Sequence, residues 1–219
     1  MSNHKIVALE CPACKTEYDI TYWQSLNAEI DPEAKEKLLS GELFTEVCPS
    51  CGKTNKVNYP LLYHDMKQKV MINLVLDKEK TEWNPRGIAS DFSFLSSNVL
   101  DGYRFRIVRS QNTLREKAKI FNCCMDDRII EIMKCFHWKH FIDENQSVAL
   151  NDIYFNDYNS LFIFEFLADD NKLYTMKFNM DMYKLISNEV LHAIEYESKD
   201  NYSIDKEWAH SFVEKYFKQ

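Results

Sequence analysis

Glycine and proline are scarce in this chain, with four Gly and five Pro among 219 residues. Such a composition excludes collagen-like and linker-dominated chains. Long hydrophobic runs are also lacking. The most apolar stretch, residues 161–168, is interrupted by Glu165 and cannot span a hydrocarbon core of about 30 Å. The first ten residues hold only the apolar run Ile6–Leu9, shorter than the roughly 7–15 residues of a signal sequence. We therefore expect a cytoplasmic protein without a membrane partner.

Positive charge is in deficit, since 27 Lys and Arg face 34 Asp and Glu and the net charge is −7. This balance disfavours a general nucleic-acid coat protein, because phosphate binding needs clustered positive charge. Hydrophobic residues make up 45% of the chain, which is enough for a packed core and excludes wholesale disorder. Without an export signal, the seven cysteines favour thiols or metal ligands over a disulfide framework.

Four of the cysteines form two matched pairs, Cys11-Pro-Ala-Cys14 and Cys48-Pro-Ser-Cys51. Two Cys-x-x-Cys turns supply the four soft, tetrahedral ligands that Zn²⁺ prefers, and four sulfurs leave no open position for water. A redox dithiol is the alternative, but such a motif usually begins a helix in a βαβ unit, and no such context surrounds either pair. The sequence therefore predicts a structural Zn²⁺ site held by Cys11, Cys14, Cys48 and Cys51.

The chain divides into two regions by composition. Residues 1–76 contain both cysteine pairs, and residues 88–219 lack that pattern. The segment between them, residues 77–87, is polar and ends with Pro85 and Gly87, which indicates a linker loop. We predict two domains with this boundary.

The 33 residues between Cys14 and Cys48 exceed the roughly 15–20 of the simple four-cysteine spacing. We expect an insertion there, with a strand over residues 18–22 and a helix that begins at Asp31-Pro32-Glu33 and ends at Gly41. Alternating apolar residues predict further strands over residues 70–76 and 103–108.

The remainder of the chain alternates between helical and extended patterns. Apolar residues at steps of three and four predict a helix over 114–136, which Asp126-Asp127 kinks or interrupts. Strands are expected over 153–155, 161–167 and 173–178, with a turn at 168–171, and helices over 181–197 and 204–218. The expected class is α+β, an N-terminal zinc-ribbon-like β domain with a helical insertion followed by a larger mixed α+β domain.

Several motifs together give a resemblance to a known family. They are Cys11-Pro-Ala-Cys14, Asp31-Pro32-Glu33, Leu39-Ser-Gly-Glu-Leu43, Cys48-Pro-Ser-Cys51-Gly52 and Tyr59-Pro-Leu-Leu-Tyr-His-Asp65. The chain resembles the bacterial CpXC domain family over residues 5–76 and, more loosely, around Asp126 to Lys134. The resemblance implies a zinc-ribbon-like metal site and no established activity. One departure is Lys15, where glycine is usual after the first pair.

Other ionisable residues are candidates with less specific patterns. His64 and Asp65 point to opposite faces of a strand, so we favour a turn-forming histidine bonded to backbone over a general base or an extra ligand. His137 and His140 share a helix face but lack a third ligand, so a solvated helix end is preferred to a second metal site. Cys123, Cys124 and Cys135 are interpreted as reduced core thiols.

The segment 104–119 is locally basic, with Arg104, Arg106, Arg109, Arg115, Lys117 and Lys119. Tyr103 and Phe105 alternate away from the arginines, so aromatic and cationic side chains should lie on opposite faces, with the aromatics in the core and the charges in solvent.

Three functions stay open at this point. We expect a non-enzymatic zinc protein that acts through an unknown protein partner. A nucleic-acid-binding ribbon using residues 104–119 is the alternative from a different class. An enzyme with an unidentified site in the C-terminal domain is the third, although no convergent nucleophile and base are evident.

Overall fold

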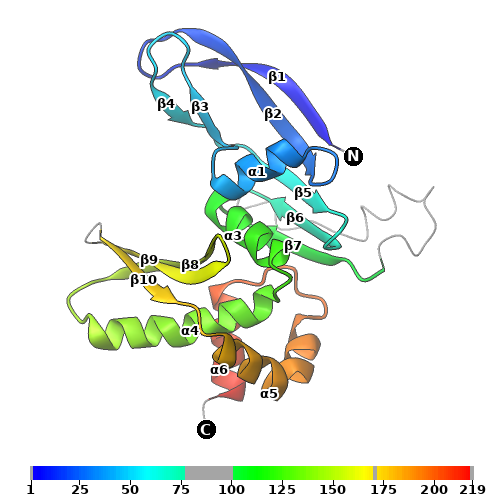
Figure 1. Ribbon diagram of the computed structural model, residues 1–219, viewed down its shortest axis with the longest axis vertical. Helices are drawn as coiled ribbons and strands as arrows, with labels where there is room; N and C mark the ends of the chain where they lie inside the picture. The colour runs from blue at the N-terminus through cyan, green and yellow to red at the C-terminus, as the bar shows by residue number, and fades with distance from the viewer. Residues whose placement is uncertain (1, 77–100, 170–171, 218–219) are drawn as a thin grey trace. The chain divides into compact units, whose positions relative to one another are not determined.

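The computed structural model describes residues 2–76, 101–169 and 172–217 (Figure 1). The chain forms two compact units, Met1–Ala118 and Lys119–Gln219, which are described separately. These units differ from the predicted domains because β7 (Arg104–Val108) pairs with β6 (Val70–Leu74), so residues beyond position 87 add a strand to the first unit. The predicted linker, residues 77–87, lies outside the described residues and stays a prediction.

A five-stranded mixed sheet, with strand order β1-β2-β5-β6-β7, forms most of the first unit. The elements before β6 are, in chain order, β1 (Asn3–Glu10), β2 (Glu17–Asn27), α1 (Pro32–Ser40), β3 (Thr45–Val47), β4 (Thr54–Lys56) and β5 (Leu61–Asp65). The pairs β1–β2 and β5–β6 are antiparallel, whereas β2–β5 and β6–β7 are parallel. Strands β3 and β4 form a separate hairpin beside the far ends of β1 and β2 (Figure 1).

Helix α1 begins and ends as the sequence predicts. Pro32 occupies its first turn, and Gly41 is its C-cap with a left-handed φ of 90°. Asp31 is the N-cap residue, but its side chain makes no capping hydrogen bond. An added Cβ at Gly41 would lie 2.5 Å from Nη1 of Arg115 in helix α3 (Gln111–Asn122), so the flexible end of that side chain would have to shift. Arg115 thus packs against the C-terminal end of α1, where a cation is favourable.

Strand β5 fixes α1 to the sheet through one buried carboxylate. Asp65, which is 1% exposed, accepts hydrogen bonds from the Lys35 ammonium and the Tyr63 hydroxyl, each at 3.1 Å, and from the Gln68 amide at 2.8 Å. Burial raises the pKa of Asp65, but the Gln68 amide and Lys35 outweigh it and lower the pKa overall. The ion pair between Lys35 and Asp65 therefore joins α1 to β5.

The second unit contains the end of α3, a three-stranded antiparallel sheet of order β10-β9-β8, and three further helices. Its elements are α4 (Asp127–Glu144), β8 (Leu150–Tyr158), β9 (Leu161–Ala168), β10 (Leu173–Lys177), α5 (Met180–Ser198) and α6 (Lys206–Tyr216). The predicted helix over 114–136 is interrupted at Asp126, as expected. The Asp126 side chain caps α4 by accepting from the Arg128 amide at 2.9 Å.

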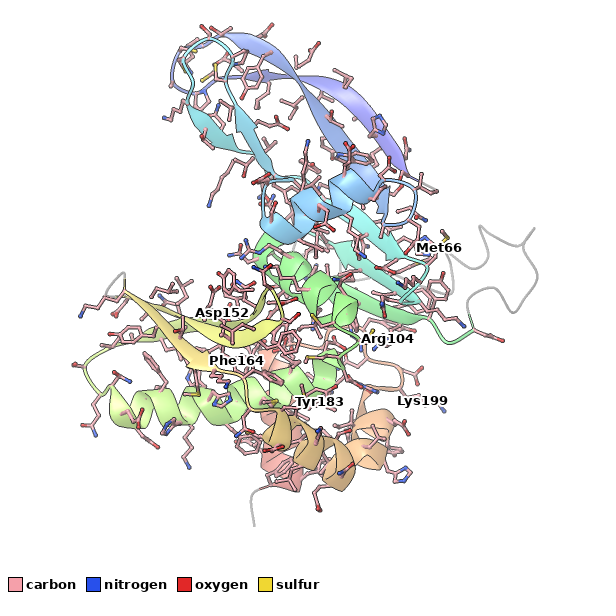
Figure 2. The ribbon with its side chains drawn as sticks, in the orientation of Figure 1. Met66, Arg104, Asp152, Phe164, Tyr183 and Lys199 are labelled. Atoms are coloured by element: carbon pink, nitrogen blue, oxygen red, sulfur yellow. The ribbon has the colours of Figure 1, made fainter. Side chains whose placement is uncertain are left out.

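One face of this sheet packs against α4 through aromatic rings. Phe164 of β9 lies on that face (Figure 2), and the ring of Phe166 stacks on Phe141 of α4 with centroids 5.0 Å apart. Phe155 and Phe178 extend the same core. The expected α+β class is thus confirmed at the level of mixed helices and sheets. None of the helices in the described ranges has the length and apolarity to cross a membrane.

His137 lies in the middle of α4 and is buried, so the expected solvated helix end is wrong for this residue. Its ring is 4.9 Å from that of Phe164, and within the described part of the chain its Nε2 has no hydrogen-bond partner. His140 lies in the last turn and is exposed beside Glu144. Burial, followed by the charge of His140, lowers the pKa of His137.

The buried imidazole should make stability depend on pH. Because the folded protein lowers the pKa of His137 from 6.5, the unfolded chain binds more protons just below that value. The stabilising contribution of neutral His137 to the free energy of unfolding should therefore be complete above about pH 6.5. It should be lost as the pH falls from the pKa of the unfolded chain toward the lower pKa of the folded protein. His137→Phe should flatten this dependence in urea denaturation, whereas His192→Gln, at an exposed position of α5, should not. An unchanged slope in the His137 variant would contradict this account.

Candidate metal centre

The four cysteine sulfurs of the two Cys-x-x-Cys pairs converge at the end of the first unit. All four Sγ atoms lie within 4.8 Å of one another. Two of the separations are 3.7 Å, from Cys11 to Cys51, and 3.6 Å, from Cys14 to Cys48. A tetrahedron of sulfurs each about 2.3 Å from a central ion has edges of about 3.8 Å. The cluster therefore has the dimensions of a four-sulfur metal site.

The two turns that present the sulfurs have the same backbone geometry. In each, the amide four residues after the first cysteine donates to its carbonyl at 2.9 Å, from Lys15 to Cys11 and from Gly52 to Cys48. Both donor residues have a left-handed backbone conformation, with φ of 64° at Lys15 and 70° at Gly52. Lys15 thus adopts the conformation that glycine takes in the other turn, at a cost of about 1 kcal/mol relative to glycine.

Burial differs between the two members of each pair. Cys11 and Cys48 are 0% and 1% exposed, whereas Cys14 and Cys51 are exposed. The first cysteine of each turn therefore faces the protein, and the second faces solvent. An ion held by all four sulfurs would have protein on one side and water on the other.

Electrostatics in the cluster favour a bound cation. The Cys14 amide lowers the pKa of Cys11, and the Thr16 hydroxyl and amide lower the pKa of Cys14 to about 6. At Cys51 the Lys53 amide lowers the pKa, but the Cys14 thiol, burial and the other sulfurs raise it to about 12. The pKa values of Cys11 and Cys14 are thus lowered while that of Cys51 is raised, because thiolates this close repel one another. A metal ion removes that repulsion.

Asn55 supports the cluster from β4, and the sequence analysis did not identify it. Its buried side chain directs Nδ2 to Cys11 Sγ at 3.7 Å and to the Tyr18 hydroxyl at 3.0 Å. Amide donors that hold ligating sulfurs in place tune metal sites. Asn55 is buried between the exposed Thr54 and Lys56. The signal in the sequence that could have identified it is a polar residue at a strand position that faces inward.

His64 does not form a pair with Asp65. As expected for adjacent strand residues, the two side chains point to opposite faces. The His64 ring lies with Nε2 3.0 Å from the Tyr103 hydroxyl and Nδ1 3.4 Å from Asn27 Nδ2. The prediction of a turn histidine bonded to backbone is wrong, since His64 lies in β5 and contacts side chains. Burial lowers its pKa.

The basic segment is less exposed than the sequence suggests. Arg106 and Lys117 are 5% and 1% exposed, and Arg106 donates to the Phe105 carbonyl at 2.8 Å. On β7 the face with Arg106 and Val108 is buried, whereas Phe105 is only half-buried. The expected division, with aromatics in the core and arginines in solvent, is therefore wrong.

The three remaining cysteines are separate from the cluster. Cys123 and Cys135 are half-buried against the core of the second unit, and burial raises their pKa values to about 12 and about 11. Cys124 is exposed at the break between α3 and α4, which corrects its assignment to the core. Among the described residues, the cysteines of the two pairs form the only group of three or more metal-ligating side chains that converge in this way.

Two matched Cys-x-x-Cys turns converge on one sulfur cluster, an arrangement compatible with metal binding. The chain belongs to the CpXC family, since the family model described as CpXC protein matches residues 9–134. No curated protein and no solved structure matched the chain. The family match contains both cysteine pairs and ends within α4, so β8 to α6 lie beyond it.

The Asn55 contact should matter for metal affinity. Asn55→Leu removes the amide donor while retaining side-chain volume, and loss of such a contact typically weakens binding by about 10–100-fold. Competition with a chromophoric zinc chelator measures the change. Thr54→Val, an exposed neighbour on β4, is the matched control and should retain normal affinity. Equal affinities in the two variants would show that Asn55 does not support the site.

Proposed function

We propose that Cys11, Cys14, Cys48 and Cys51 bind one Zn²⁺ as a structural site. The observation that carries this proposal is the convergence of four sulfurs within 4.8 Å on two turns of the same geometry. Tetrahedral sites with four sulfurs suit zinc or iron. Zinc is redox-inactive, and its all-thiolate shell has no position for a catalytic water. These properties favour a structural role.

A metal ion at this site would join two parts of the first unit, which the hydrogen bond from Asn55 to Tyr18 also links. Strands β3 and β4 have three residues each, and an isolated two-stranded hairpin is marginally stable in water. A shared ion would link this hairpin to the turn between β1 and β2. Metal binding would then contribute directly to the folding free energy of this region.

We also propose that the protein acts through contacts with a protein partner rather than by catalysis. Supporting this, three leucines on the sheet of the second unit are exposed, with exposed fractions of 53% for Leu161, 50% for Leu167 and 71% for Leu173. Leu167 and Leu173 are direct partners across β9 and β10. Neighbouring exposed apolar side chains are typical of protein contact surfaces.

Zinc content tests the first proposal. Purified, reduced protein should contain one zinc per chain by elemental analysis, and Cys48→Ser should lose it, because three thiolates bind far less tightly than four. The variant should also melt at a lower temperature.

Cys124→Ser is the matched control, since Cys124 is an exposed thiol outside the cluster. This variant should keep its zinc and its melting temperature. Zinc-free wild-type protein, or a Cys48→Ser variant that retains zinc, would contradict the structural zinc site.

The nucleic-acid alternative has weaker support because Arg106 and Lys117 are buried. If phosphates bind, log affinity should fall with log salt at about −0.7 to −0.9 per phosphate. Arg104 and Arg109 are the arginines to test, since replacing buried Arg106 would disturb the fold. We expect no binding near physiological salt by fluorescence anisotropy. A micromolar, salt-sensitive complex that Arg104→Ala and Arg109→Ala weaken would favour this alternative.

A further inference from the structure

A cavity of about 310 Å³ lies within the second unit, where α4, β8 and the first turn of α6 meet. Its walls are built from Glu131, Lys134, Cys135, Trp138, Asp152, Ile153, Lys206, Glu207 and His210. The α4 residues are three and four positions apart, so they line one face of that helix. The volume is at the small end of the range for ligand pockets, roughly 300–1,000 Å³. It suits a ligand with one or two rings.

The inner wall carries a charge pair that is already neutralised. Glu131 and Lys134 form an ion pair of 3.0 Å, and their side chains are 3% and 10% exposed. Beside them, burial raises the pKa of Cys135 to about 11, so this thiol is neutral at physiological pH. Ile153 adds an apolar surface. This wall can therefore contact an uncharged part of a ligand without attracting an ion of either sign.

The Trp138 ring, on the same face of α4 as Lys134 and Cys135, lies beside a positive charge from α6. The Lys206 ammonium lies 6.0 Å from the centroid of the Trp138 ring. Lys206 is the first residue of α6, whose N-cap residue Asp205 already accepts from the Trp208 amide at 3.0 Å. A ligand ring beside Trp138 would place a carboxylate near the Lys206 ammonium. Lys206 and its neighbour Glu207 are both exposed, so water screens both charges.

A single carboxylate on β8 provides the complementary charge. Asp152 projects from β8 (Figure 2), is half-buried, and uses Oδ1 to accept from the Ile153 amide at 2.9 Å. A carboxylate held in this way can accept a hydrogen bond from a ligand ammonium through its other oxygen. The cavity therefore offers an acidic group on β8, a basic group on α6 and an aromatic ring on α4.

We propose that this cavity binds a small aromatic molecule that carries both an ammonium and a carboxylate group, such as an aromatic amino acid. The ring stacks on Trp138, the carboxylate meets Lys206 at the start of α6, and the ammonium meets Asp152. Each of these groups matches one ligand feature, and the neutral wall of Glu131, Lys134 and Cys135 encloses the ring. This binding site is separate from the zinc site and does not depend on it.

Three probes of similar size test the chemistry of the site. L-phenylalanine carries both charged groups, 3-phenylpropionate lacks the ammonium, and phenethylamine lacks the carboxylate. Saturation-transfer NMR titrations of the full chain give an affinity for each. We expect phenylalanine to bind at least about tenfold more tightly than either analogue, since each charge-assisted contact contributes about 1.4 kcal/mol or more.

Variants assign each charge to a residue. Asp152→Asn should reduce the preference for phenylalanine over phenylpropionate, and Lys206→Met should reduce its preference over phenethylamine. Trp138→Leu should weaken all three probes. Lys139→Met and Asp143→Asn are matched controls, because both residues are exposed on α4 and lie outside the cavity wall.

Several results would overturn the proposal. They are the absence of saturable phenylalanine binding below about 10 mM, an analogue that binds as tightly as phenylalanine, and preferences that Asp152→Asn and Lys206→Met leave unchanged. Circular dichroism of each variant verifies that the loss of binding is not a loss of fold. Asp152→Asn and Lys206→Met replace side chains that are half-buried and exposed, so we expect both variants to fold. They keep the test valid if Trp138→Leu fails to fold.

Discussion

Four thiols held within 4.8 Å of one another create the constraint on which the first unit depends. Thiolates at such distances repel, so they cannot all ionise unless a cation lies between them. Features of the surrounding structure would favour such a cation. Two identical turns aim the sulfurs, backbone amides and Thr16 favour ionisation of Cys11 and Cys14, and Asn55 contacts Cys11 from the neighbouring hairpin.

The second unit is stabilised in a different way. Its core consists of apolar and aromatic side chains from α4, α5, α6 and one face of the sheet. The charged residues that remain partly buried around Trp138 lie in the cavity of this unit. Metal binding and ligand binding would therefore belong to different units of the chain, each with its own source of stability.

The sequence was sufficient for features that depend on local chemistry. The paired cysteines, α1 between Pro32 and Gly41, and the break at Asp126 all follow from the preferences of the residues concerned. The sequence was insufficient where packing between distant segments decides which strands pair and which side chains are buried. Strand β7 joins a sheet whose other strands end before residue 76, and the burial of Arg106, Asn55 and His137 depends on neighbours distant in sequence. Alternation along β7 gave two faces but could not show which of them is buried.

We propose that the cysteines of both pairs bind one zinc ion together. X-ray absorption at the zinc edge reports the identity and number of the ligand atoms. We expect four sulfur atoms at about 2.3 Å and no nitrogen or oxygen bound to the zinc. A shell with fewer than four sulfurs, completed by nitrogen or oxygen at about 2.0 Å, would contradict a closed structural site.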